Sequence, residues 1–197
     1  MKKLLIIMLL ALAGTACGGD FEDGEAAYSK NNYSVAIAKY KLAAAKGHAG
    51  AQYRIGFMYH MGVGVTQDDA EALKWYKLAA AQGDAEAQFY SGFMYDTGRG
   101  VVQNSAEALK WYKLASAQGN ASARVLIGRI YEEGEGVVQD YVRAHMWYNL
   151  SVTGGGGVGA SAARDRDLVE AKMTTQQIAK AQELARECQA RNFEYCD

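Results

Sequence analysis

Apolar residues recur at helical spacing through most of this chain, and the same pattern returns after a fixed interval. From residue 71 the sequence EALKWYKLAAAQG places Ala72, Trp75, Tyr76 and Ala79 on one side of a helix. It returns from residue 107 as EALKWYKLASAQG, 36 residues later. A period of this size is typical of stacked supersecondary units, each burying its apolar face against the next. The pattern predicts an all-α protein, an α-solenoid of stacked antiparallel helix pairs.

Each predicted repeat has a first helix, a glycine turn, a second helix and a glycine-rich connector. First helices are predicted at 33–46, 69–82, 105–118 and 141–152, and second helices at 49–61, 85–97 and 121–133. A capping helix at 21–30 precedes them. A glycine-rich turn at 154–159 displaces the last second helix to 160–172, and a helix at 175–191 covers the open end. Asp68 and Asn104 are predicted N-caps, with Glu71 and Glu107 three residues on in a capping-box arrangement.

These elements divide the chain into four parts. A leader at 1–16 is followed by a tether and capping helix at 17–32. The repeats occupy 33–153, with units at 33–68, 69–104 and 105–140 and the start of a fourth. The glycine-rich insertion, the last second helix and the C-terminal cap occupy 154–197.

Several positions recur in register and are predicted to build the core. They are Trp75, Trp111 and Trp147, Gly56, Gly92 and Gly128, and Tyr59, Tyr95 and Tyr131. Glycine inside a helix costs roughly 1 kcal/mol relative to alanine, so its recurrence predicts that a backbone or an aromatic ring packs there. Leu78 is expected to pack with Trp75 and Tyr76, whereas Lys74 and Lys77 face outward.

Residues 1–16 have the pattern of an export signal. Lys2 and Lys3 precede a short apolar core, which is too short for a comfortable permanent span, and small residues follow. The small residues before Cys17 resemble the lipobox of bacterial lipoproteins, in which the cysteine is lipidated, although Gly14 stands where leucine is usual. That resemblance, with Gly18 after the cysteine, implies a lipid anchor in the outer membrane, facing the periplasm. The alternative is a plain secretory signal and a soluble periplasmic or secreted protein.

The cysteine count agrees with export. If Cys17 carries lipid, Cys188 and Cys196 remain as a pair eight residues apart. A helix end that folds back through Asn192 would bring them together, and an oxidising compartment would preserve the bridge. Metal binding is the weaker interpretation because no histidine lies nearby, and two free buried thiols are the third.

The repeat pattern also resembles a known family. AxxWYxxAAxxG, followed by AxxxxGxMY and GxGVxQ, resembles the Sel-1-like repeat, a relative of the tetratricopeptide repeat. AHMWYNLSV and ARDRDLVEAKMTTQQIAKAQELARE resemble the terminal repeat and cap of bacterial members. The connectors lack the usual proline and have Thr66, Val102 and Val138 instead. The resemblance implies a non-enzymatic adaptor in envelope signalling, morphogenesis or host interaction.

No catalytic, metal or cofactor site is indicated. The glycine pairs of the connectors lack a preceding strand and a following GK[ST], so they are turns and not phosphate loops. His48, His60 and His145 do not pair at metal-binding spacing, and SxxK and GxSxG are absent. Asp165 and Asp167 alternate with arginines, which indicates a salt-bridged helix surface. The net charge of −1 gives no basic surplus for nucleic acid.

One polar feature repeats. Lys41, Lys77 and Lys113 share one helix position, and Lys74 and Lys110 share another. When the repeats stack, these lysines would form two short ladders that attract an acidic protein segment or an anionic polymer. The competing interpretation is a solvated face balanced by Glu71 and Glu107.

The sequence therefore predicts a monomeric interaction scaffold of the bacterial envelope that binds another protein or a peptide segment. A β-lactam-binding or β-lactam-hydrolysing protein is an alternative, implied by resemblance to cysteine-rich secreted members of the same family. In those members a cysteine pair eight apart recurs in each repeat, whereas here only Cys188 and Cys196 have that spacing. Binding of peptidoglycan or another glycan through groove tyrosines is a further alternative.

Overall fold

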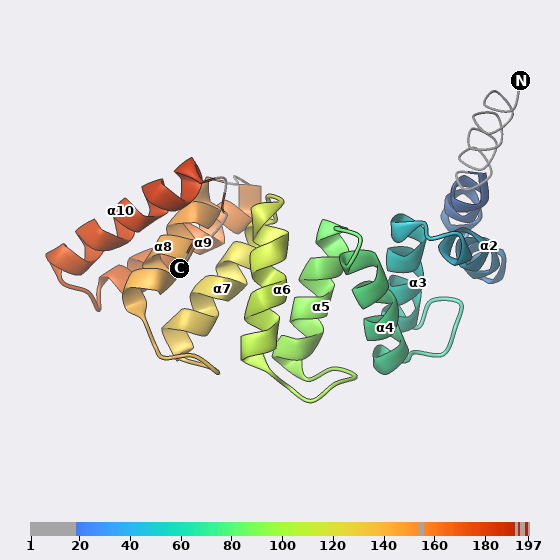
Figure 1. Ribbon diagram of the computed structural model, residues 1–197, viewed down its shortest axis with the longest axis horizontal. Helices are drawn as coiled ribbons and strands as arrows, with labels where there is room; N and C mark the ends of the chain where they lie inside the picture. Colours follow the sequence, from blue (N-terminus) through green and yellow to red (C-terminus); the bar gives the residue numbers. More distant parts are fainter. Residues whose placement is uncertain (1–18, 154–155, 192, 194–195, 197) are drawn as a thin grey trace, which may run out of the picture. The chain divides into compact units, whose positions relative to one another are not determined.

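The computed structural model describes residues 19–153, 156–191, 193 and 196 (Figure 1). Within these residues the regular structure is helical and no strand occurs. A helix at 19–29 comes first. It is followed by α2 (Tyr33–Ala45), α3 (Ala49–Met61), α4 (Asp69–Ala80), α5 (Ala85–Thr97), α6 (Ser105–Ala117), α7 (Ala121–Glu133), α8 (Tyr141–Val152), α9 (Gly156–Glu170) and α10 (Thr175–Ala190). The predicted all-α solenoid of helix pairs is confirmed.

The second helices of the repeats, α3, α5 and α7, begin and end at the predicted residues. Gly62 and Gly134 end α3 and α7 in the left-handed conformation, with φ of 67° and 73°. The first helices α2, α4 and α6 begin as predicted and end one or two residues earlier. Helix boundaries are therefore largely encoded by local signals.

The start of α9 corrects the prediction. The helix begins at Gly156, whereas the glycine-rich turn was expected to continue to residue 159. A Cβ on Gly159 would lie 3.0 Å from the carbonyl oxygen of Val152 in α8. The glycines thus allow α9 to pack closely on α8, and this tertiary contact outweighs their poor helix propensity.

Polar side chains cap the helix starts. Oδ1 of Asp68 accepts the backbone N–H of Glu71 at 2.9 Å. The same cap recurs at Asp84, Asn104, Asn120 and Asp140. Of the two hydrogen bonds of the predicted capping box, the one from the Glu71 N–H to Asp68 is present. The Glu71 carboxylate accepts from Lys74 and Trp75 and not from the Asp68 backbone N–H. Thr174 forms a complete capping box at the start of α10.

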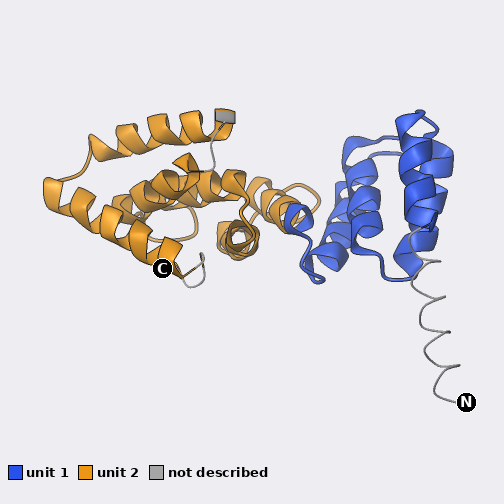
Figure 2. Cartoon of the chain, turned by 90° about the horizontal axis from the view of Figure 1, so that it is seen from above, with its two compact units in different colours: residues 1–87 blue, residues 88–197 orange. Residues whose placement is uncertain are grey.

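The chain divides into two compact units, residues up to Ala87 and residues from Gln88 onward (Figure 2). The core cluster of unit 1 contains residues of helix 19–29, α2 and α3, among them Tyr40, Ile55 and Met58. The core cluster of unit 2 is larger and includes residues of α6, α7, α8, α9 and α10. Small alanines at the contacts let the helices approach closely.

Buried tyrosine rings pack against helix glycines. A Cβ on Gly92 would lie 2.6 Å from Cδ1 of Tyr112, a distance that real Cβ atoms do not adopt. The same contact joins Gly24 to Tyr40, Gly56 to Tyr76 and Gly128 to Tyr148. A close backbone or aromatic ring was predicted at Gly56, Gly92 and Gly128, and the structure shows a tyrosine ring at all three. Gly24 shows that helix 19–29 packs as a second helix does.

Three of these tyrosines donate their hydroxyl groups to carboxylates. Tyr40 donates to Glu25 at 2.6 Å, and Tyr148 donates to Glu132 at 2.9 Å. Tyr112 donates to Asp96 at 3.2 Å. Burial is the main reason why the pKa of all three hydroxyls is raised. The tyrosines therefore remain protonated donors across the physiological pH range.

Leu78 corrects the predicted core. It is 51% exposed, and Leu114 at the next repeat is 50% exposed. Leu78 lies two residues after Tyr76, so it projects from nearly the opposite side of α4. Leu73 and Leu109, three residues before the tyrosines, are buried instead.

Burial of the recurring aromatics depends on the repeat. Trp75 and Trp111 are half-buried, as are Tyr59 and Tyr95. Their counterparts in the last repeat, Trp147 and Tyr131, are buried, at 1% and 8% exposure. The tyrosine at positions such as 76 and 112 is thus the aromatic residue that is buried in every repeat. The tryptophan is buried completely only near the C-terminal cap.

One buried position that is glutamine in two repeats is arginine in the last. Gln118 donates to Oε1 of Gln88 at 2.7 Å, and the equivalent pair occurs 36 residues earlier. Arg124 stands 36 residues after Gln88 and is 5% exposed. Its guanidinium donates to the carbonyl oxygens of Ser116 and Leu150, each at 3.2 Å. These carbonyls lie in the last turns of α6 and α8, whose negative dipole ends favour the cation.

Cys188 and Cys196 form a disulfide, which was one of the three interpretations that the sequence left open. Both are buried. Within the closed loop, Phe193 donates its N–H to the Cys188 carbonyl at 3.0 Å, and its ring centroid lies 3.7 Å from Cζ of Arg124. A cation–π contact therefore joins the disulfide loop to the buried arginine. Asn192, at which the chain was expected to fold back, lies outside the described residues.

The glycine–tyrosine contact predicts that Gly92→Ala destabilises the protein, although alanine is the better helix former. The new methyl group would overlap the buried Tyr112 ring, at an expected cost of about 1–3 kcal/mol in the free energy of unfolding. Urea denaturation followed by circular dichroism measures it. Gly157→Ala is the control, because no atom lies within 4 Å of a Cβ at that site. Equal stability of the two variants would contradict the contact.

The disulfide loop predicts that Cys188→Ser combined with Cys196→Ser lowers the free energy of unfolding by about 2–3 kcal/mol. The bridge restricts the unfolded chain and holds Phe193 on Arg124. Thermal melting should give a lower Tm for the double variant, equal to that of the wild type in reductant. A wild-type Tm that is insensitive to reductant would show that the loop is held by packing alone.

Candidate functional site

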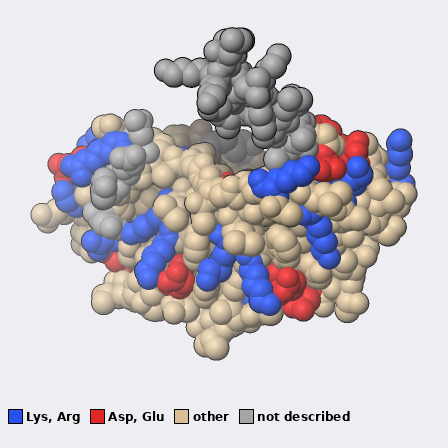
Figure 3. Space-filling model, turned by 45° about the vertical axis from the view of Figure 1, so that its right-hand side comes forward, with Lys and Arg blue, Asp and Glu red and all other residues tan. Residues whose placement is uncertain are grey.

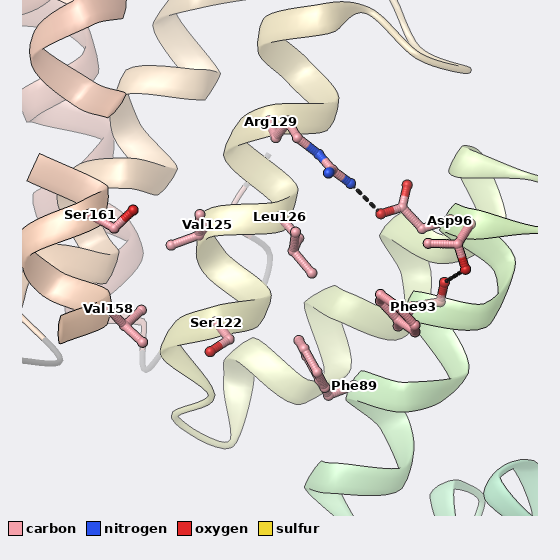
Figure 4. Close-up of a pocket in the computed structure, with 10 residues that line it drawn as sticks. Phe89, Phe93, Asp96, Ser122, Val125, Leu126, Arg129, Val158 and Ser161 are labelled. Carbon is pink, nitrogen blue, oxygen red and sulfur yellow. Dashed lines mark hydrogen bonds and ion pairs between the residues drawn. The ribbon is translucent and has the colours of Figure 1, made fainter. Parts of the chain in front are cut away.

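Unit 2 contains an open apolar groove with a cavity volume of about 340 Å³ (Figure 4). Three helices, α5, α7 and α9, supply its walls. The lining residues are Phe89, Phe93, Asp96, Thr97, Ser122, Val125, Leu126, Arg129, Val158 and Ser161. The groove is therefore formed mainly by second helices of successive repeats.

Large apolar side chains form most of the groove surface. Phe89 and Phe93 lie one turn apart on α5; Leu126 of α7 points toward them, and Val125 of α7 points toward α9 (Figure 4). These four are half-buried and pack against the edge of the unit 2 core. Val158 of α9 is 37% exposed. Their outer surfaces remain in contact with water, so an apolar ligand side chain placed here would release that water.

A charged pair stands at the rim of the groove. Nη2 of Arg129 on α7 contacts Oδ2 of Asp96 on α5 (Figure 4). Asp96 is 4% exposed, and the same oxygen accepts the Tyr112 hydroxyl. Arg129 is held in place by a carboxylate that is fixed in the core, while 41% of its own side chain is exposed. A positioned guanidinium loses less conformational entropy when it binds a ligand.

Sequence reasoning missed this groove because its residues do not repeat. Phe89 corresponds to Tyr53 one repeat earlier and to Val125 one repeat later. Phe93 corresponds to Arg129 one repeat later. A search for recurrent residues identifies the core positions. The groove lies at exposed positions of neighbouring second helices, where the residue types differ between repeats. An available signal was the apolar character of Val125 and Leu126 on a helix face that the core does not need.

The structure places the predicted lysines on exposed or half-buried surface. Nζ of Lys74 lies 2.8 Å from Glu71, and the pair Lys110–Glu107 has the same distance. Nζ of Lys41 lies 6.0 Å from the Tyr59 ring. Lys77 is exposed and Lys113 is half-buried. The space-filling view shows acidic side chains beside basic ones (Figure 3). A partner-binding role for these lysines remains a prediction.

The histidines have structural contacts. His48 caps α3 by accepting the N–H of Ala51. Nδ1 of His60 lies 2.7 Å from Asp69, and Nε2 of His145 lies 3.1 Å from Glu170. Among the described residues, no three histidine, cysteine or acidic side chains are grouped to hold a metal ion.

The predicted leader and Cys17, the predicted site of lipidation, lie outside the described residues. In the part of the chain that is described, none of the helices has the length and apolar character needed to cross a bilayer.

Comparison with known proteins identifies the repeats. The Sel1 repeat pattern matches residues 49–84, 85–120 and 121–155. A Sel1 repeat protein from Oxalobacter formigenes is 29% identical, with a TM-score of 0.64 over 85% of this chain and 75% of that one. A protective antigen of uropathogenic Escherichia coli with an SLR fold is 23% identical, with a TM-score of 0.61 over 91% of this chain and 47% of the other. The latter likeness concerns the fold alone.

One curated relative is an exopolysaccharide production negative regulator of Rhizobium leguminosarum bv. viciae. It is 44% identical over 54 residues, which are 27% of this chain and 20% of that protein. The match therefore spans about a fifth of the length of the relative. The three matched repeats, together with the helix pairs seen in the structure, show that the chain belongs to the Sel1 repeat family.

Proposed function

We propose that this protein is a non-enzymatic scaffold of the bacterial cell envelope, and that a segment of another protein docks in the groove of unit 2. Sel1 repeat proteins typically mediate protein–protein interactions, and the family is generally non-catalytic. The observation that carries the proposal is the apolar groove between α5, α7 and α9. It offers exposed aromatic and aliphatic surface in a concave site with few polar groups, as ligand sites usually do.

The groove has the features of an anchor site. Burial of apolar surface contributes roughly 25 cal/mol per Å², so one large side chain packed on Phe89, Phe93 and Leu126 supplies much of the affinity of a short segment. Arg129 adds hydrogen-bond donors at the rim in a fixed position. These walls are parts of helices that the core holds in place, which reduces the entropy lost on binding.

The envelope location is supported by two features. The leader at 1–16 has the composition of an export signal, followed by Cys17. The disulfide between Cys188 and Cys196 is a bond that persists in oxidising compartments such as the periplasm. We include in the proposal a lipid on Cys17 that anchors the scaffold to the outer membrane.

Groove docking predicts that Leu126→Glu abolishes binding of peptides selected from a random library on the immobilised mature chain. The buried carboxylate would remove apolar contact and pay a desolvation cost, lowering affinity by at least about tenfold. Calorimetric titration of the selected peptides measures the change.

Leu114→Glu is the matched control, because Leu114 is 50% exposed and lies outside the groove. It should keep wild-type affinity. Lys77→Glu tests the alternative lysine surface in the same assay. Loss of binding in Lys77→Glu with normal binding in Leu126→Glu would move the docking site from the groove to the first helices.

The anchoring proposal predicts that mass spectrometry of the mature protein finds Cys17 as a diacylated or triacylated first residue, in the membrane fraction. Cys17→Ser should move the protein to the soluble fraction. An unmodified Cys17 in membrane-free wild-type protein would refute the lipid anchor and leave the groove proposal intact.

A further inference from the structure

The charges at the groove rim do not balance. Asp96 and Arg129 form an ion pair, and Glu133 follows Arg129 by one helical turn. The carboxylate of Glu133 lies 4.0 Å from Nε of Arg129 and its side chain is 47% exposed. One guanidinium is thus shared by two carboxylates, so among these three side chains the carboxylates outnumber the cation by one. The extra carboxylate, Glu133, stands one helical turn beyond the lining residue Arg129.

The opposite wall of the groove does not cancel that charge. The α9 residues that line the groove, Val158 and Ser161, are uncharged. Further along α9, Arg164 and Asp165 follow Ser161 by three and four residues and have opposite signs. The α5 wall adds the hydroxyl of Thr97, which donates to the Phe93 carbonyl.

An anionic ligand group would therefore meet a guanidinium that two carboxylates already compensate. A cationic group would meet the accessible carboxylate of Glu133 next to the apolar surface. Charge complementarity of this kind mainly sets partner choice and association rate, and apolar burial sets most of the affinity.

We infer that the groove selects a segment with a large apolar side chain directly beside a lysine or arginine. The apolar side chain packs between Phe93, Leu126 and Val158, and the cation lies at Glu133. This inference rests on the proposed docking function and names the chemistry of the partner. It is opposite to the acidic partner that the surface lysines would attract.

Three synthetic peptides test the inference. They are acetylated and amidated Gly-Ser-Xaa-Trp-Xaa-Ser-Gly, with lysine, glutamine or glutamate at both Xaa positions. Calorimetry at low salt should rank them lysine, glutamine, glutamate, with steps of about two- to fivefold in Kd, as exposed ion pairs give. The steps should shrink at high salt, because screening weakens exposed charges.

Glu133→Gln should remove the advantage of the lysine peptide over the glutamine peptide. Glu135→Gln is the control: like Glu133, Glu135 is an exposed acid outside the groove lining, but the ion pair with Arg129 is formed by Glu133. It should keep the wild-type ranking. A ranking that Glu133→Gln leaves unchanged would overturn the inference.

The outcomes separate the two proposals. If the three peptides bind equally and Leu126→Glu abolishes binding of all three, groove docking stands and the basic preference is wrong. If the glutamate peptide binds best, the inference is also wrong. If none binds wild type, both the inference and the groove as docking site are refuted.

Discussion

The contact between a buried tyrosine ring and a helix glycine is the constraint on which the rest of this structure depends. At Gly92 a Cβ would lie 2.6 Å from the Tyr112 ring, so only glycine lets α5 and α6 approach this closely. The ring carries its hydroxyl into the interior, where it needs a partner, and Asp96 accepts it. A buried carboxylate needs a cation, and Arg129 supplies it. Core packing thereby positions the guanidinium at the groove rim.

Two other buried tyrosines also have a carboxylate acceptor and a cation that pairs with it, but the residues differ. Glu25 accepts from Tyr40 and pairs with Arg54 at 2.7 Å. Glu132 accepts from Tyr148 and pairs with Lys172 at 3.0 Å. At these three tyrosines a carboxylate accepts the hydroxyl, whereas the cation varies in type and comes from different elements. One repeat before Asp96 the same position is His60. Variation around a constant core is how a repeat protein acquires a local site without altering its packing.

The C-terminal end shows how a solenoid is closed. Leu150 is fully buried, although its counterpart Leu114 is half exposed, because α9 and α10 pack on α8. Figure 1 shows α10 lying alongside α8. Arg124 donates to the last turns of α6 and α8, and Phe193 of the disulfide loop covers its guanidinium. Apolar burial, helix dipoles and a covalent bridge together cover α8.

The sequence by itself determined the helices, their caps, the repeat and the glycine contacts with aromatic rings, because each depends on local spacing that recurs every 36 residues. It indicated Cys188 and Cys196 as a candidate pair and left free thiols and metal binding open, and the tertiary structure decided for the bridge. Tertiary structure decided what does not recur. Gly156 begins a helix only because α9 packs on α8, and Leu78 is exposed because its angular position on α4 points away from the neighbouring helices. The groove required three helices to be placed together: its lining positions recur every 36 residues, as in Phe89, Val125 and Ser161, but the residue types at these positions differ.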